Sequence, residues 1–220
     1  MTQRLLVMDI DSTLIDEEVI DELGDACGFG QQISEITARA MNGEIDFTRA
    51  LQERVRLLKG LSTDIFDEVY ARLHVTNGAR TLIDTAHARD WTVGVVSGGF
   101  HEVADKLVAE LGIDYCYAHT LGTSTREDGQ SVLDGTVTSD IVTKETKLAQ
   151  LRAWAEKDGL TLDQTIAIGD GANDIPMIQA AGVGIAFCAK PVTRAAAPYQ
   201  INERNLALAL DIIDRHDSRR

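Results

Sequence analysis

Cysteine is scarce and unpaired in this sequence. The 220 residues contain three cysteines, Cys27, Cys116 and Cys188, which are widely separated and form no CxxC pair. An odd number at such spacing argues against both a disulfide framework and a zinc knuckle. We therefore expect reduced, buried thiols in a cytosolic protein.

Long apolar runs are also missing. No stretch approaches the roughly 20 apolar residues that a membrane-spanning helix needs. The first residues, Met1-Thr2-Gln3-Arg4, lead directly into a predicted strand, so we expect no signal peptide. A cytoplasmic location follows as the expectation.

Positive charge is in short supply. The chain has 21 lysines and arginines against 35 acidic residues, which gives a formal net charge of −14. We therefore expect no nucleic acid and no membrane among its partners. A small-molecule substrate is expected instead, bound by a monomer or a homodimer. The length suffices for one sizeable core and a small accessory domain.

The most informative stretch lies at the N-terminus. The apolar run Leu5–Met8 predicts a strand that is buried on both faces of a parallel sheet. Asp9 and Asp11 follow it, at the end of the strand where such sheets carry ligands and catalytic groups. Two carboxylates at a buried strand end require compensation. A divalent metal could neutralise their negative charge, and a metal beside a carboxylate nucleophile suggests phosphoryl chemistry. Alternatively, the two residues form a solvated turn.

The rest of the chain divides into two patterns. Residues 14–74 show helical spacing almost throughout, which predicts a small helical domain inserted after the first strand. Residues 1–13 and 75–220 alternate strands with helices, which predicts a doubly wound parallel α/β sheet. A turn signal at Glu127-Asp128-Gly129 predicts a β-hairpin flap around 120–140. The core strands are expected at residues 5–8, 91–96, 165–168, 183–187 and 199–201.

Three of these strands end in polar residues. They are followed by Asp9 and Asp11, by Ser97-Gly98-Gly99, and by Asp170, Asn173 and Asp174. The carboxyl ends of parallel strands lie along one edge, so these groups are expected to meet in one crevice. The glycines allow backbone N–H groups to approach an anion closely. The order of the three motifs is more specific than any one of them.

These motifs resemble those of a known family. Asp9-Ile10-Asp11-Ser12-Thr13, Ser97, Lys147 and Gly169-Asp170-Gly171-Ala172-Asn173-Asp174 are similar to the four motifs of the haloacid-dehalogenase-like phosphohydrolases. The resemblance extends over nearly the whole chain to members that act on phosphoserine. It implies a Rossmann-like core with a helical-bundle cap, and Mg²⁺-dependent hydrolysis of O-phospho-L-serine to L-serine and phosphate. That reaction is the last step of serine biosynthesis.

The chemistry and the resemblance together suggest catalytic roles. Asp9 is expected to be the nucleophile that forms an aspartyl-phosphate, and Asp11 the acid and base of the two steps. Mg²⁺ would be held by Asp9, by the backbone carbonyl of Asp11 and by Asp170. Asp174 is interpreted either as a supporting carboxylate or as a helix cap.

Phosphate binding is also assigned through the resemblance. Lys147 would neutralise the nucleophile and the transferring oxygens, although its sequence context alone does not distinguish it from Lys144. Ser97 and the Gly98 amide resemble the phosphate-oxygen donors of the family, and Asn173 lies among its substrate-binding positions. Ser97 could instead be a simple turn or N-cap serine, but its placement after a buried strand argues against that alternative.

The inserted helices should select the substrate. Arg54 lies on the apolar stripe of its predicted helix, whereas Arg56 lies roughly opposite. Arg54 either binds a substrate carboxylate or is a boundary residue with a buried stem. Glu18 resembles the residue that faces the substrate ammonium, and the sequence alone does not prefer it to its acidic neighbours Glu17 and Glu22. Pocket-lining or ordinary core positions are expected for Met41 and Phe47.

Two other functions compete with this interpretation. One is a capped phosphatase or phosphotransferase of the same superfamily that acts on a different small phosphomonoester. The other is a non-enzymatic, Mg²⁺-dependent phospho-acceptor switch. The pair Arg54 and Glu18 discriminates against the first, because a sugar phosphate would not need it. Asp11 argues against the second, because a neighbouring base would shorten the life of a phospho-aspartate.

Overall fold

The N-terminal strand lies at the centre of a parallel sheet. The structure is a computed structural model that describes residues 3–41 and 44–218. In these ranges six strands form one sheet in the order β3-β2-β1-β6-β7-β8. Strand β1 (Leu5–Met8) is fully buried and pairs in parallel with β2 (Thr92–Phe100) and with β6 (Thr165–Gly169). The predicted doubly wound α/β fold is therefore confirmed.

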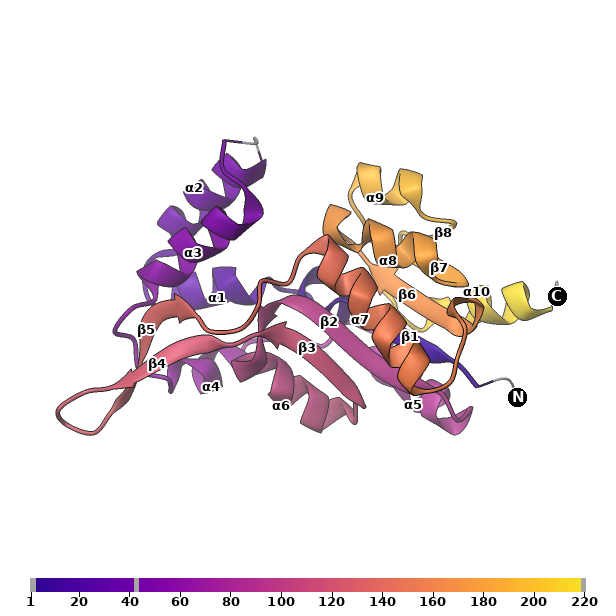
Figure 1. Ribbon diagram of the computed structural model, residues 1–220, viewed down its shortest axis with the longest axis horizontal. Coiled ribbons are helices and arrows are strands. Elements are labelled where there is room, and N and C mark those ends of the chain that lie inside the picture. The colour runs from indigo at the N-terminus through magenta and orange to yellow at the C-terminus, as the bar shows by residue number, and fades with distance from the viewer. Residues whose placement is uncertain (1–2, 42–43, 219–220) are drawn as a thin grey trace.

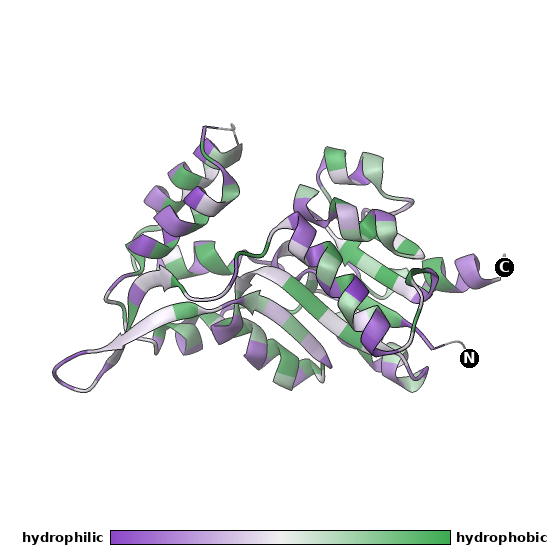
Figure 2. Cartoon of the chain, in the orientation of Figure 1, coloured by the Kyte–Doolittle hydropathy of each residue, from purple (hydrophilic) through white to green (hydrophobic). Residues whose placement is uncertain are grey.

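Helices cover both faces of this sheet. Side chains of a strand alternate between the two faces, and those of β1 enter two separate apolar cores. Leu6 and Met8 join one core, and Leu5 and Val7 join the other. Figure 2 shows much of the centre of this sheet in green, the colour of hydrophobic residues. The first core is completed by α5 (Ala79–Ala88), α6 (His101–Leu111) and α10 (Leu208–Asp217), and the second by α7 (Lys144–Lys157) and α8 (Ile175–Ala180).

Among the described residues, four α-helices lie between β1 and α5 along the chain. They are α1 (Val19–Ala26), α2 (Gly30–Met41), α3 (Phe47–Leu57) and α4 (Ile65–Tyr70). Figure 1 shows α2 and α3 rising away from the sheet, while α4 lies beside α6. The apolar faces of α1, α3 and α4 join the same core as the sheet. That residues 14–74 form a separate cap domain therefore stays a prediction.

A hairpin follows an edge strand that the sequence did not predict. Strand β3 (Tyr115–His119) pairs with β2, but its Tyr-Cys-Tyr start is only half-buried and lacks an aliphatic run. Strands β4 (Leu121–Thr125) and β5 (Ser131–Val137) then form an antiparallel pair. Gly129, with a φ of 83°, supplies the left-handed residue that the turn needs. The hairpin holds the helical insertion, because the Leu133 carbonyl accepts a 2.8 Å hydrogen bond from the Gly60 N–H.

The remaining elements close the far side of the sheet. Strand β7 (Val183–Phe187) pairs with β6 and with β8 (Tyr199–Ile201), and the short helix α9 (Pro191–Ala196) connects the two outer strands. Among the residues that the structure describes, no helix combines the length and the apolar character required to cross a bilayer.

Candidate active site

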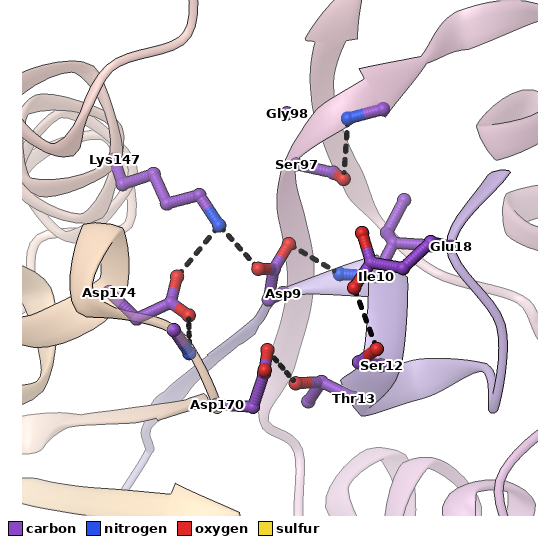
Figure 3. A network of polar contacts seen from close by, with 12 residues as sticks. Asp9, Ile10, Ser12, Thr13, Glu18, Ser97, Gly98, Lys147, Asp170 and Asp174 are labelled. Carbon is purple, nitrogen blue, oxygen red and sulfur yellow. Dashed lines mark hydrogen bonds and ion pairs between the residues drawn. The ribbon is translucent and has the colours of Figure 1, made fainter. Parts of the chain in front are cut away.

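Asp9 lies directly after β1, at the carboxyl edge of the sheet. It is only 5% exposed. Its Oδ1 accepts a 2.7 Å hydrogen bond from the backbone N–H of Ile10, and its Oδ2 lies 2.6 Å from the Nζ of Lys147. Figure 3 shows the side chain between these two donors. Both contacts fix the orientation of this carboxylate group, which is a candidate nucleophile.

Lys147 bridges two carboxylates in the interior. Its Nζ also lies 2.7 Å from Oδ1 of Asp174, and the lysine side chain is fully buried. Burial lowers the pKa of Lys147, but the negative charges of Asp174 and Asp9 raise it by more than burial lowers it. The net effect is a raised pKa, so the ammonium stays protonated. Lys144, the other candidate of the sequence analysis, is 59% exposed and lies 3.8 Å from Glu145. The structure thus places Lys147, and not Lys144, beside Asp9.

A cluster of three carboxylates could hold a divalent metal. Asp9, Asp170 and Asp174 each offer an oxygen, and these oxygens lie within 4.8 Å of one another. Burial and the charge of Asp9 raise the pKa values of both Asp170 and Asp174. Both causes act against the charged form of these carboxylates, and a bound cation would oppose them. Carboxylate oxygens with excess negative charge suit a hard cation such as Mg²⁺, so the residues fit a metal ion.

A second set of possible ligands does not fit a metal. His101, Asp105 and Cys116 also lie close together on α6 and β3. However, Nε2 of His101 accepts a hydrogen bond from the Ala118 N–H, so its Nδ1 carries the proton and donates to Asp105 at 2.8 Å. Burial raises the pKa of the Cys116 thiol to about 12, which disfavours a thiolate ligand.

Asp11 lies in a strained turn that follows Asp9. The Ile15 N–H donates to the Ile10 carbonyl across residues 10–14, and Ser12 has a φ of 56°, which is unusual for a residue with a side chain. The turn points Asp11 toward the end of β2, where a Cβ atom on Gly99 would lie 3.0 Å from Asp11 Oδ2. Burial, Glu18 and Asp9 raise the pKa of Asp11 well above its usual value.

The same turn positions Glu18. The Ser12 hydroxyl donates a 2.7 Å hydrogen bond to Oε1 of Glu18, and burial raises the pKa of this carboxyl group. Glu17 is turned elsewhere, because its Oε1 lies 2.6 Å from Nδ1 of His74. Of the acidic residues 17, 18 and 22, Glu18 is the one that lines the cleft above Asp9.

The end of β2 supplies donors for an anion. The register between β2 and β3 shifts between Val96 and Phe100, so Ser97, Gly98 and Gly99 form an irregular end of the strand. The Gly99 N–H donates a 2.9 Å hydrogen bond to Oγ of Ser97. Since that oxygen already accepts a hydrogen bond from Gly99, the hydroxyl group of Ser97 can donate its own hydrogen bond to a ligand.

These groups meet in a cleft of about 360 Å³ between the sheet edge and the helical insertion. The predicted residues that line it are Asp9, Asp11, Glu18, Phe47, Arg54, Gly98, Asp170 and Asn173. Ser97, Lys147 and Asp174 are fully buried around it. The side chain of Met41 lies outside the described part of the structure. A cavity of about 380 Å³ at β8 and α10 has other lining residues, so volume alone does not identify the site.

Phe47 and Arg54 are among the residues of α3 that line the cleft. The guanidinium of Arg54 makes two long hydrogen bonds, 3.3 Å to the Ala50 carbonyl and 3.4 Å to the Thr37 hydroxyl. Phe47 is 42% exposed, and its ring tip would lie 3.6 Å from a Cβ atom on Gly98. Phe47 therefore faces the end of β2 and not the interior of the helical bundle.

Lys190 and Thr13 belong to the site but are not among the residues predicted from the sequence. Lys190 lines the cleft, and its positive charge lowers the pKa of Asp170, which burial and Asp9 raise. It precedes Pro191 at the start of α9, just after β7, so the rule that strand ends share one edge could have found it. Thr13 donates a 3.5 Å hydrogen bond to Asp170, and only the three-dimensional contact reveals this.

Comparisons with known proteins agree with this geometry. Residues 6–179 match the family model described as haloacid dehalogenase-like hydrolase. A phosphoserine phosphatase of Streptococcus thermophilus is 56% identical over 210 residues, which cover 96% of this chain and 95% of that protein. A phosphoserine phosphatase of Lactococcus lactis subsp. lactis is 54% identical, with the same coverage of both chains.

Solved structures are also similar. The structure of a phospho-aspartyl intermediate analogue of phosphoserine phosphatase matches with a TM-score of 0.86 and 37% identity, over 96% of this chain and 99% of that chain. A substrate-bound phosphoserine phosphatase complex matches with a TM-score of 0.87 and 36% identity over the same shares.

Proposed function

Because this chain belongs to the haloacid dehalogenase-like hydrolase family, we propose that it hydrolyses O-phospho-L-serine to L-serine and phosphate through an aspartyl-phosphate. The observation that carries the proposal is one cleft with two kinds of charged groups. Asp9 and Lys147 meet at its base, and Arg54 and Glu18 lie on the side of the helical insertion. Phosphoserine needs both sets, because it presents an ammonium and a carboxylate beyond its phosphate.

In the first step, a carboxylate oxygen of Asp9 attacks phosphorus. The P–O bond to the serine oxygen breaks, and the carboxyl group of Asp11 donates its proton to that leaving oxygen. Asp11 can reach this oxygen because its turn points it toward Gly99 at the end of β2. Lys147 and the Ser97 hydroxyl stabilise the negative charge on the phosphoryl group during transfer.

In the second step, water attacks the aspartyl-phosphate. The Asp11 carboxylate now accepts a proton from this water, and the Asp9–phosphate bond breaks to release inorganic phosphate. Each group then returns to its starting protonation state. A single acid and base thus serves both halves of the reaction, which accounts for two carboxylates placed two residues apart.

We further propose Mg²⁺ as the metal. Asp9, Asp170 and the backbone carbonyl of Asp11 would hold it, and Asp174 would keep Lys147 and the Gly171 N–H oriented beside the cluster. When bound, Mg²⁺ would neutralise charge on the phosphoryl oxygens.

We also propose that residues 14–74 act as a cap. Phe47 lies over Gly98, and Arg54 and Glu18 face the same cleft, so the insertion supplies the wall that recognises the serine moiety. Such a wall would also limit the access of water before the leaving serine has departed.

Phosphate release from a panel of phosphomonoesters tests this function. We expect phosphoserine to be hydrolysed faster than sugar phosphates and phosphoglycolate. EDTA should abolish turnover, and added Mg²⁺ should restore it, because the carboxylate cluster is repulsive without a cation. Turnover that survives EDTA, or a panel in which phosphoserine is inert, would overturn the proposal.

Arg54→Ala should mainly raise the KM for phosphoserine. Loss of a charge-assisted hydrogen bond costs about 1.5–3 kcal/mol, which corresponds to roughly a 10- to 100-fold change in KM. The kcat should change much less, because Arg54 contacts no reacting atom. Steady-state kinetics on phosphoserine and on O-phosphoethanolamine, which keeps the ammonium but lacks the carboxylate, measure the effect.

Arg56→Ala is the matched control. It removes an exposed arginine from the same helix, outside the cleft, and should leave both substrates unaffected. If Arg54→Ala raises the KM for phosphoserine and for O-phosphoethanolamine by the same factor, Arg54 does not bind the substrate carboxylate.

A further inference from the structure

His119 is a fully buried histidine to which the proposed reaction assigns no role. It ends β3 and has no exposed surface. Its Nδ1 lies 2.9 Å from the carbonyl oxygen of Gly98, and its Nε2 lies 2.8 Å from the backbone nitrogen of Val142. The ring therefore joins the end of β2 to the segment that precedes α7.

The two contacts fix the tautomer of the ring. A backbone N–H can only donate, so Nε2 of His119 must accept from Val142. The Gly98 carbonyl can only accept, so Nδ1 must carry the proton. Burial lowers the pKa of His119, and the positive charge of Arg54 acts in the same direction, whereas the hydrogen bond to Gly98 opposes them. The neutral ring protonated at Nδ1 satisfies both partners.

His119 holds one particular peptide group. The carbonyl of Gly98 and the N–H of Gly99 belong to the same peptide plane. The carbonyl accepts from His119, and the N–H donates to Ser97 Oγ at 2.9 Å. Two glycines have wide conformational freedom, so without these bonds the plane could rotate. Fixing it also fixes the direction in which the Ser97 hydroxyl can donate.

The other contact of His119 leads to the catalytic lysine. Val142 precedes Thr143, the N-cap of α7, whose side chain accepts from the Thr146 N–H. Lys147 lies one turn into this helix, with its Nζ beside Asp9. One imidazole thus connects the donors at the end of β2 with the helix that carries the cation.

We propose that His119 is a positioning residue that sets the orientation of the Gly98–Gly99 peptide, and hence of the Ser97 phosphate donor, relative to Lys147. The inference rests on the proposed function for its catalytic consequence. The tautomer of His119 and its hydrogen bond to the Gly98–Gly99 peptide do not depend on which phosphomonoester is the substrate.

Two substitutions separate the two hydrogen bonds. The amide nitrogen of His119→Asn can occupy the place of Nδ1 and keep the donor to Gly98. The amide oxygen of His119→Gln can reach the place of Nε2 and keep the acceptor for Val142, but it leaves Gly98 unbonded. Both variants remove the ring from the same buried position, so they share the packing loss.

We expect His119→Gln to lower kcat for phosphoserine by about tenfold or more and to weaken inhibition by inorganic phosphate to a similar degree. His119→Asn should stay within about threefold of the parent in both. Thermal unfolding, measured with the kinetics, should show similar losses for the two variants. Equal kinetic losses in both variants, or an unchanged inhibition constant in His119→Gln, would overturn the proposal.

The unsubstituted protein provides a second test that does not require turnover. Two-bond ¹H–¹⁵N correlation spectra should show the His119 ring protonated at Nδ1, and its signals should shift when inorganic phosphate and Mg²⁺ are added. An Nε2-protonated ring would contradict the geometry. If the protein hydrolyses no phosphomonoester, the proposed function fails, while the tautomer and the phosphate-induced shift still decide the role of His119.

Discussion

An Asp9→Asn variant should release phosphate from phosphoserine at least about 10⁴-fold more slowly than the parent protein. The asparagine amide is not a nucleophile for phosphorus, so no acyl phosphate can form. The fold should survive, because the amide oxygen can still accept from the Ile10 N–H and Lys147 keeps its contact with Asp174. Phosphate release, measured with the unfolding midpoint of the same sample, gives the result.

Asp84→Asn serves as the control for this loss. Asp84 is an exposed residue of α5 that does not line the cleft, and its substitution should leave turnover unchanged. If Asp9→Asn retains more than a few per cent of the parent rate, Asp9 is not the nucleophile.

The second large effect is expected at Lys147. Lys147→Met removes the cation between Asp9 and Asp174 and leaves two buried carboxylates without the positive charge that neutralises them. Breaking a buried ion pair by deleting one partner costs about 3–5 kcal/mol of the free energy of unfolding. Turnover should be lost as well, because the phosphoryl oxygens lose their neutralising charge. Urea denaturation and phosphate release measure the two consequences.

The stability loss of Lys147→Met should depend on the metal. Mg²⁺ would partly replace the missing charge, so Lys147→Met should be destabilised more in EDTA than with Mg²⁺. The control is Lys144→Met, which removes an exposed lysine from the first turn of the same helix and should change neither quantity. A Lys147→Met protein as stable as the parent in EDTA would show that Lys147 is not needed to compensate the cluster.

The general plan of the fold could be predicted because it depends on local patterns. The apolar run before Asp9 and the similar runs at residues 91–96 and 165–168 indicate buried parallel strands, and parallel strands bring their carboxyl ends to one edge. This pattern alone predicts that Asp9 and Asp170 lie close together. Strand β3 was missed because half-buried aromatic residues at a sheet edge give no such run.

Choices between neighbouring residues required the structure. Lys147 and Lys144 lie one turn apart on the same helix, and only burial beside Asp9 separates them. Glu18 is distinguished from Glu17 by a backbone turn at Ser12, which has a positive φ. A serine in the sequence does not predict a positive φ. Local propensity cannot specify these contacts, because tertiary packing decides them.

Contacts between distant segments were the least predictable. Lys147 reaches Asp174 across 27 residues, and His119 connects Gly98 with Val142. In the sequence each is an ordinary polar residue on a helix or an edge strand. Their roles arise from the arrangement of three strand ends and one helix, which only the folded chain provides.

Trapping the covalent intermediate tests the central claim most directly. The protein is mixed with [³²P]phosphoserine and Mg²⁺, quenched in acid, digested and mapped by mass spectrometry. Radioactive phosphate should appear on the peptide that contains Asp9, be released by hydroxylamine as an acyl phosphate, and be absent from Asp9→Asn. An Asp11→Asn variant given p-nitrophenyl phosphate, whose leaving group needs no acid, should accumulate the same phosphopeptide. Rapid phosphate release with no label on Asp9 in either protein would contradict the account.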